Sequence, residues 1–240
     1  MKKVAKVLLV ASCSIISLLM SLIVLTGIYF GVKGYQMYRE ATEHVPIREK
    51  VETIQQQEGF TQFEELPEIY IQAVIAVEDK RFWDHQGVDY LAIARAVWQD
   101  LKAGALVEGG STITQQLMKN EYFTQDKTWE RKFAEIFAAW ELEKECSKEE
   151  IFELYVNTIY FGSGYYGIYD AAEGYFHKTP QALSGYEAVM LAGLPNAPSV
   201  YSPDTNPELA EQRMRQVLSR MVACGVMDQE EASQILGPAS

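Results

Sequence analysis

One stretch near the N-terminus constrains this chain more than any other feature. Residues 7–32 contain no charged side chain and consist mainly of leucine, isoleucine, valine and small residues. As a helix rising about 1.5 Å per residue, the stretch is longer than the roughly 30 Å hydrocarbon core of a bilayer. It therefore predicts one transmembrane helix over residues 7–32, with residues 1–6 as a cytoplasmic N-terminus.

The charges beside this stretch predict its orientation. Lysines at positions 2, 3 and 6 precede it, and Lys33 and Arg39 follow it. Basic residues close to a span favour the cytoplasmic side, so the N-terminus is expected inside and the rest of the chain outside. A cleaved signal peptide and a lipid anchor at Cys13 are the alternatives. A signal peptide has an apolar core of about 7–15 residues, and here the apolar run continues past Cys13, so we expect an uncleaved span.

About two hundred residues follow the span, enough for one domain with its own core. We divide them into a polar, acidic stalk over residues 33–65 and a folded domain over residues 66–240. Apolar residues recur there at helical spacing, and Ser-x-x-Glu capping boxes begin at Ser147 and Ser184. The prediction is a domain that is all or nearly all α-helical.

Composition excludes several kinds of site. A formal net charge of −12 argues against a nucleic-acid partner, which needs a basic face to neutralise phosphates. The three cysteines and three histidines are too scattered for a disulfide framework or a metal cluster. Gly162 to Gly167 fit the glycine pattern of a dinucleotide-binding loop, but no strand–helix–strand unit surrounds them, so we expect a tight turn.

Three polar stretches interrupt the helical pattern, and the first is residues 77–87. Here an apolar helix ends in Glu78 and Asp79, followed by Arg81, two aromatic residues and His85. A carboxylate at the end of a buried helix loses water, which raises its pKa toward the range that a general acid or base needs. The alternative is a solvated helix end in which Asp79 pairs with Arg81.

The second stretch, residues 108–120, suits a groove for a polar ligand. Two glycines let the backbone approach a ligand closely. Hydrogen-bonding side chains follow almost consecutively, those of Ser111, Thr112, Thr114, Gln115 and Gln116, and then Lys119. Such side chains fit the hydroxyl and amide groups of a sugar, although a solvated loop would also contain many of them.

The third stretch, residues 127–135, gathers cations at the start of a predicted helix. Lys127, Arg131 and Lys132 precede Glu135, which lies one turn beyond Arg131. Basic side chains beside a helix N-terminus are suited to a pyrophosphate. The alternative is an ordinary surface ion pair between Arg131 and Glu135.

Taken together, these stretches resemble the peptidoglycan glycosyltransferases, glycosyltransferase family 51, and most closely their monofunctional membrane-bound members. The resemblance runs from about Leu66 to Leu218. Five blocks match in order: residues 78–82 with His85 and Gly87, residues 110–116, residues 131–135, residues 153–162, and residues 171–178. One block would be weak support, whereas five in order are specific.

The resemblance implies a mostly α, lysozyme-like helical domain with a small membrane-facing jaw lobe. The jaw would fall around residues 120–140, where four aromatic residues either meet lipid or belong to the core: Tyr122, Phe123, Trp129 and Phe133. The implied location is the bacterial inner membrane, with a single span and the catalytic domain outside the cytoplasm.

The implied reaction is a hexosyl transfer that polymerises lipid II into peptidoglycan glycan strands. The implied processes are cell-wall biogenesis and the maintenance of cell shape. The growing chain, linked to undecaprenyl pyrophosphate, passes with inversion to the 4-hydroxyl of lipid II and forms a β-1,4 bond. The implied partners are lipid II, the growing glycan chain, the membrane and other cell-wall synthesis and division proteins. Sensitivity to inhibitors of the moenomycin type is also implied.

The resemblance also implies residue roles. Glu78 would be the general base and Glu135 a second catalytic glutamate. The implied substrate-binding residues are Arg95, Ser111, Gln115, Gln116, Lys119, Lys127, Arg131 and Lys132. No cofactor or metal ligand is required, and a divalent cation, Mg²⁺ or Mn²⁺, is an optional aid to the pyrophosphate.

The chain departs from the family pattern at two positions. Lys127 stands where arginine is frequent, which keeps the charge and loses the planar fork, and His177 stands where glycine is usual. Bifunctional members continue into a transpeptidase domain, so an end at Ser240 predicts a monofunctional enzyme or a fragment. The alternatives to a polymerase are a lysozyme-like enzyme that cleaves glycan and a catalytically inert membrane scaffold.

Overall fold

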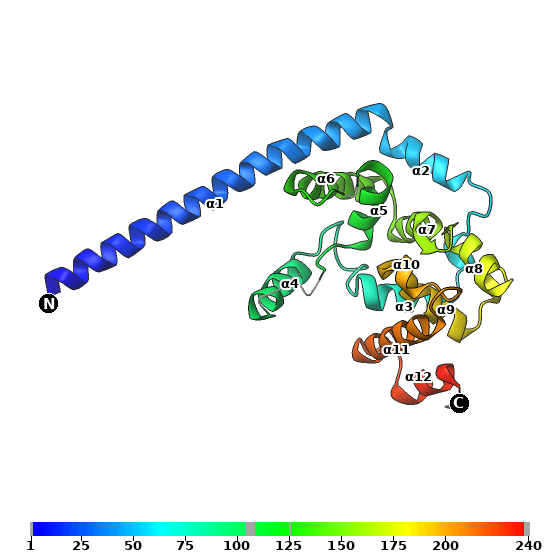
Figure 1. Ribbon diagram of the computed structural model, residues 1–240. Coiled ribbons are helices and arrows are strands. Elements are labelled where there is room, and N and C mark those ends of the chain that lie inside the picture. The colour runs from blue at the N-terminus through cyan, green and yellow to red at the C-terminus, as the bar shows by residue number, and fades with distance from the viewer. Residues whose placement is uncertain (1, 104–108, 125, 238–240) are drawn as a thin grey trace.

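A computed structural model describes residues 2–103, 109–124 and 126–237 (Figure 1). Glu108, where the second polar stretch begins, and the last three residues of the predicted domain lie outside the described residues. As predicted, the described chain is mostly α-helical. The elements are α1 (Lys2–His44), α2 (Ile47–Gln55), η1 (Phe63–Glu65), α3 (Glu68–Glu78), α4 (Tyr90–Ala103), α5 (Ile113–Tyr122), α6 (Trp129–Glu145), α7 (Lys148–Thr158), β1 (Tyr160–Gly162), β2 (Tyr165–Tyr166), α8 (Ile168–Phe176), η2 (Pro180–Ala182), α9 (Gly185–Gly193), η3 (Leu194–Asn196), α10 (Pro198–Tyr201), α11 (Pro207–Ala223) and α12 (Gln229–Leu236).

Helix α1 extends well past the predicted end of the span at residue 32. Its N-terminal half projects away from the rest of the molecule, and its second half lies along α6 (Figure 1). Over Leu9–His44 the helix is long and apolar enough to cross a membrane. Tyr35 and Tyr38 then contact Phe137 of α6, with ring centroids 5.3 and 6.1 Å apart. The C-terminal part of α1 is therefore docked on the domain.

The segment predicted as a stalk, residues 33–65, packs against the domain. Ile47, Val51 and Ile54 form an apolar stripe along α2 and are buried. The Thr61 N–H donates to Asn157 Oδ1, and Asn157 Nδ2 donates to the Thr61 carbonyl, both at 2.9 Å. The segment is polar on average, but its apolar residues recur at helical spacing, which is enough to bury one face.

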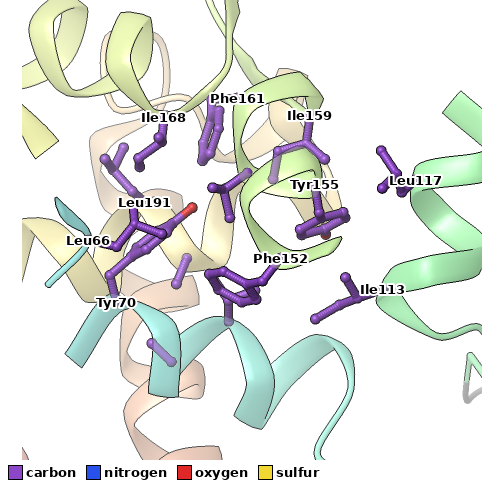
Figure 2. Close-up of a cluster of buried hydrophobic side chains, with 14 of the residues drawn as sticks. Leu66, Tyr70, Ile113, Leu117, Phe152, Tyr155, Ile159, Phe161, Ile168 and Leu191 are labelled. Atoms are coloured by element: carbon purple, nitrogen blue, oxygen red, sulfur yellow. The ribbon is translucent and has the colours of Figure 1, made fainter. Parts of the chain in front are cut away.

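The core is built around α9, in which every residue from 188 to 193 is buried. Helices α3 and α11 pack against α9 and against each other. Figure 2 shows Tyr70 of α3, Phe152 and Tyr155 of α7, and Leu191 of α9 converging in this core. Because α3 is fixed in the core, its last residue, Glu78, has a fixed position.

Local signals in the sequence are confirmed. Both capping boxes are present, with the Ser147 and Ser184 hydroxyls accepting from backbone N–H groups three residues on. The glycine pattern after residue 161 forms a β1–β2 hairpin. Gly162, Ser163 and Gly164 all have positive φ there, as a tight turn requires.

His177 gives a test of the backbone at the end of α8, where it adopts φ 53° and ψ 43°. The left-handed conformation costs a residue with a Cβ about 1–2 kcal/mol. We expect His177→Gly to raise the free energy of unfolding by about 1 kcal/mol, measured by chemical denaturation in detergent micelles. His177→Ala is the control, since it removes the imidazole and keeps the Cβ. An equal gain in both variants would contradict the backbone explanation.

Candidate active site

The end of α3 opens onto a cleft of about 830 Å³. Helix α4, residues 109–112 and helix α11 form its other walls. Among the residues that the structure describes, its charged lining comprises five basic residues and three acidic ones: Lys80, Arg95, Arg213, Arg215 and Arg220, with Glu78, Asp79 and Asp89. The cleft is therefore basic in a chain whose net charge is −12, which favours an anionic ligand.

Glu78 is the carboxylate at the base of this cleft. Burial raises its pKa above the usual 4.5, and the hydrogen bond from Gln116 and the charge of Arg213 oppose this shift. The adjacent Asp79 raises the pKa further, and Lys119 lowers it, which leaves the carboxyl with a net raised pKa. Such a carboxylate accepts a proton more readily than an exposed one does.

Gln116 links Glu78 to the core. Its Nε2 donates to Glu78 Oε2 at 2.9 Å, and its Oε1 lies 3.5 Å from the Tyr155 hydroxyl. Gln116, which was predicted to line the groove, therefore lies beside Glu78, and its amide lies between the Glu78 carboxylate and the Tyr155 hydroxyl.

Asp79 joins the end of α3 to the start of α5. Its buried carboxylate accepts from His85 Nε2 at 2.9 Å and from the Ile113 N–H at 3.0 Å. The alternative considered from the sequence, in which Asp79 pairs with Arg81, is wrong. Arg81 hydrogen-bonds Asp89 instead and lowers the pKa of that carboxyl to about 2. The partners of Asp79 are therefore the buried His85 imidazole and the backbone at the start of α5, and not Arg81.

Glu135 lies in a second cluster, at the start of α6. Its carboxylate is 2% exposed and pairs with Arg131 and with Lys132 Nζ, the latter at 2.8 Å. Lys132 Nζ also donates to Ser111 Oγ at 2.7 Å, which connects the cluster to the cleft wall. Burial lowers the pKa of Lys119, and the Glu135 charge opposes that shift. Lys119 therefore interacts electrostatically with the cluster. The buried carboxylate rules out an ordinary surface pair.

Two predicted substrate-binding residues occupy other places. Gln115 is fully buried and completes a capping box with Thr112, whose backbone N–H donates to Gln115 Oε1 at 3.2 Å. Lys127 is exposed in the segment before α6. Neither residue is among the described residues that line the cleft, and the same holds for Gln116, Lys119, Arg131 and Lys132. Of the predicted substrate-binding residues, Arg95 and Ser111 line it.

Helix α11 contributes three arginines that we did not predict from the sequence. Arg213, Arg215 and Arg220 line the cleft from α11, which packs against Glu78's helix. Arg213 is held by donation from its Nε to the Gly193 carbonyl at 3.2 Å. The one available signal was the spacing of Arg213 and Arg220, seven residues apart and so on one helix face.

The environments of the two glutamates predict opposite effects on stability. A carboxyl whose pKa is raised by folding destabilises the folded state when ionised, so Glu78→Gln should raise the free energy of unfolding at neutral pH. The gain should shrink as the pH falls through the raised pKa and vanish near 4.5. Glu135→Gln should instead cost on the order of 3 kcal/mol, since it leaves two cations without their partner.

Denaturation of the two variants between neutral and acidic pH checks this pair of effects. Stabilisation by Glu135→Gln, or a loss of stability in Glu78→Gln at neutral pH, would contradict the assigned environments.

Comparison with known proteins shows which family the sequence resembles. The sequence model of the family described as Transglycosylase matches residues 46–222. The chain is 45% identical over 182 residues to penicillin-binding protein 1A of Neisseria flavescens, covering 76% of this chain and 23% of that protein. It is 46% identical over 168 residues to penicillin-binding protein 1F of Bacillus subtilis, covering 70% and 24%. The chain thus spans about a quarter of the length of these curated relatives.

A solved structure, that of penicillin-binding protein 1A from Haemophilus influenzae, is 23% identical with a TM-score of 0.45, covering 75% of this chain and 17% of that one. The family match covers most of the chain, including both glutamates and the basic residues around them. The chain belongs to the transglycosylase family.

Proposed function

We propose that this chain polymerises lipid II into the glycan strands of peptidoglycan. The observation that carries the proposal is Glu78, a carboxylate with a raised pKa at the base of a basic cleft, in a member of the transglycosylase family. The donor is the growing chain on undecaprenyl pyrophosphate, and the acceptor is the 4-hydroxyl of lipid II.

In the proposed step Glu78 takes the proton from the acceptor hydroxyl. The hydroxyl oxygen attacks the anomeric carbon from the face opposite the pyrophosphate. A new C–O bond forms as the bond to the pyrophosphate breaks, and the configuration inverts from α to β. The raised pKa favours proton acceptance, and the Gln116 amide keeps the carboxylate oriented.

The leaving pyrophosphate needs its negative charge neutralised, which is the proposed role of the cluster on α6. Arg131, Lys132 and Lys119 supply the positive charge, and Ser111 adds a hydroxyl beside Lys132. Glu135 then acts as a positioning residue, since it holds Arg131 and Lys132 in place. Fixed charges aimed at a developing anion are a large source of rate acceleration.

The arginines on α11 support a polymerase over a hydrolase. A polymerase of this kind binds two substrates that each carry a pyrophosphate, and so needs a second anion-binding zone. Arg213, Arg215 and Arg220 form such a zone on the α11 side of the cleft. An enzyme that cleaves glycan already free of its pyrophosphate has no use for either zone.

The proposal includes the membrane. Helix α1 spans the bacterial inner membrane with the N-terminus inside and the cleft outside. The segment 120–140 serves as the jaw at the lipid surface, where Trp129 is 67% exposed. Gln115 stabilises the start of α5 rather than binding substrate. Mg²⁺ or Mn²⁺ would enter as a counterion of the pyrophosphate.

Lipid II polymerisation by the full chain in detergent or vesicles tests the base assignment. Glu78→Gln should lower the rate at least about 10²–10⁴-fold, the usual contribution of general base catalysis. Glu68→Gln is the matched control, since Glu68 is exposed at the other end of the same helix. A wild-type rate in Glu78→Gln would overturn the assignment, and degradation of preformed strands by wild type would favour the hydrolase.

Binding of a phosphoglycolipid of the moenomycin type tests the α6 cluster. Lys132→Ala should weaken its binding by about 10–100-fold, the range expected for one charge-assisted hydrogen bond. Lys144→Ala, an exposed lysine three turns further along α6, should bind as wild type does. Fluorescence anisotropy of a labelled inhibitor measures both, and equal affinity in the two variants would remove the cluster from the ligand site.

A further inference from the structure

Gly34 lies where the anchor helix α1 meets α6, two helices that run side by side in Figure 1. It is buried, although the apolar residues on the preceding turns of α1 are exposed. A Cβ at this position would lie 2.8 Å from the Glu130 carbonyl oxygen and 2.9 Å from the Ala134 nitrogen, and closer still to Phe133 Cβ. The contact is with the α6 backbone, so only glycine allows this approach.

The turn of α6 that Gly34 contacts also carries the cation cluster. Gly34 contacts the backbone of Glu130 and Ala134 and the Cβ of Phe133. Arg131 and Glu135, which form an ion pair, are the next residues along the helix from Glu130 and Ala134. Ala134 is fully buried and immediately precedes Glu135. A displacement of this backbone would move both sides of the turn together, because a helix is rigid over one turn.

We propose that Gly34 is a positioning residue, and that its contact with α6 sets the place of the cation cluster. The inference rests on the proposed function for the identity of the ligand. Helix α1 is continuous from Lys2 to His44. It therefore fixes the height and tilt of the Arg131–Lys132–Glu135 cluster above the bilayer from which both substrates come. The anchor is thereby a structural part of the binding site.

The chain offers a matched control one turn earlier on the same helix. Gly31 has no atom within 4 Å of the position where a Cβ would stand. A side chain at Gly31 therefore changes the helix composition in the same way without touching α6. Any effect common to both glycines, such as altered insertion or helix propensity, will appear in both variants.

The experiment compares Gly34→Leu and Gly31→Leu in the full chain, in detergent micelles. Titration calorimetry with inorganic pyrophosphate measures the affinity of the cluster, and lipid II polymerisation is followed in parallel. Gly34→Leu is expected to weaken pyrophosphate binding tenfold or more and to raise KM for lipid II more than it lowers kcat. Gly31→Leu should keep the wild-type affinity. Equal affinity in both variants, or an equal loss in both, overturns the inference.

If the Gly34→Leu variant does not fold, Gly34→Ala replaces it in the test. It should weaken pyrophosphate binding in the otherwise wild-type chain and have a smaller effect in a Lys132→Ala background, since one contact of the cluster is then already absent. An equal loss in both backgrounds would indicate a purely structural role and reject the inference.

Two outcomes separate this inference from the proposed function. Polymerisation by wild type with unchanged pyrophosphate affinity in Gly34→Leu rejects this inference alone. Failure of wild type to polymerise lipid II, with a pyrophosphate affinity that still depends on Gly34, rejects the proposed function and supports the positioning role.

Discussion

Packing of α3 against α9 and α11 takes Glu78 out of bulk water, and the hydrogen bond it receives there comes from the neutral amide of Gln116. Glu135 is buried as well, but Arg131 and Lys132 bind its carboxylate directly. Two glutamates of one chain thus occupy opposite electrostatic environments. That contrast suits one to accept a proton and the other to hold cations in place.

The two sites are connected by short polar contacts and by one helix pair. Ser111 belongs to the wall of the cleft and accepts from Lys132 of the cluster, while Lys119 interacts electrostatically with both glutamates. On its other side, α6 packs against α1. Helix α1, the cation cluster and the proposed base are therefore linked through a few helices that pack against one another.

Local sequence signals predicted much of this arrangement. The apolar run, the capping boxes and the carboxylate that ends an apolar helix each depend on neighbouring residues, so periodicity reveals them. Contacts between distant residues left no such signal. Tertiary packing decides three such contacts. Residues 33–65 dock on the domain, Asp79 pairs with His85 and not with Arg81, and Arg213 lines the cleft. Gln115 was predicted as a ligand because the capping box that it completes was not recognised in a polar stretch.

The pH dependence of kcat/KM for lipid II polymerisation by the full chain tests the central claim most directly, because kcat/KM reports the essential groups of the free enzyme. The account predicts an acidic limb above pH 4.5, the usual carboxyl value. It also predicts a further rise in Gln116→Ala, since the Gln116 hydrogen bond lowers the pKa of Glu78. An acidic limb at the usual carboxyl value, or one that falls when Gln116 is replaced, would contradict the claim that Glu78, with its raised pKa, is the base.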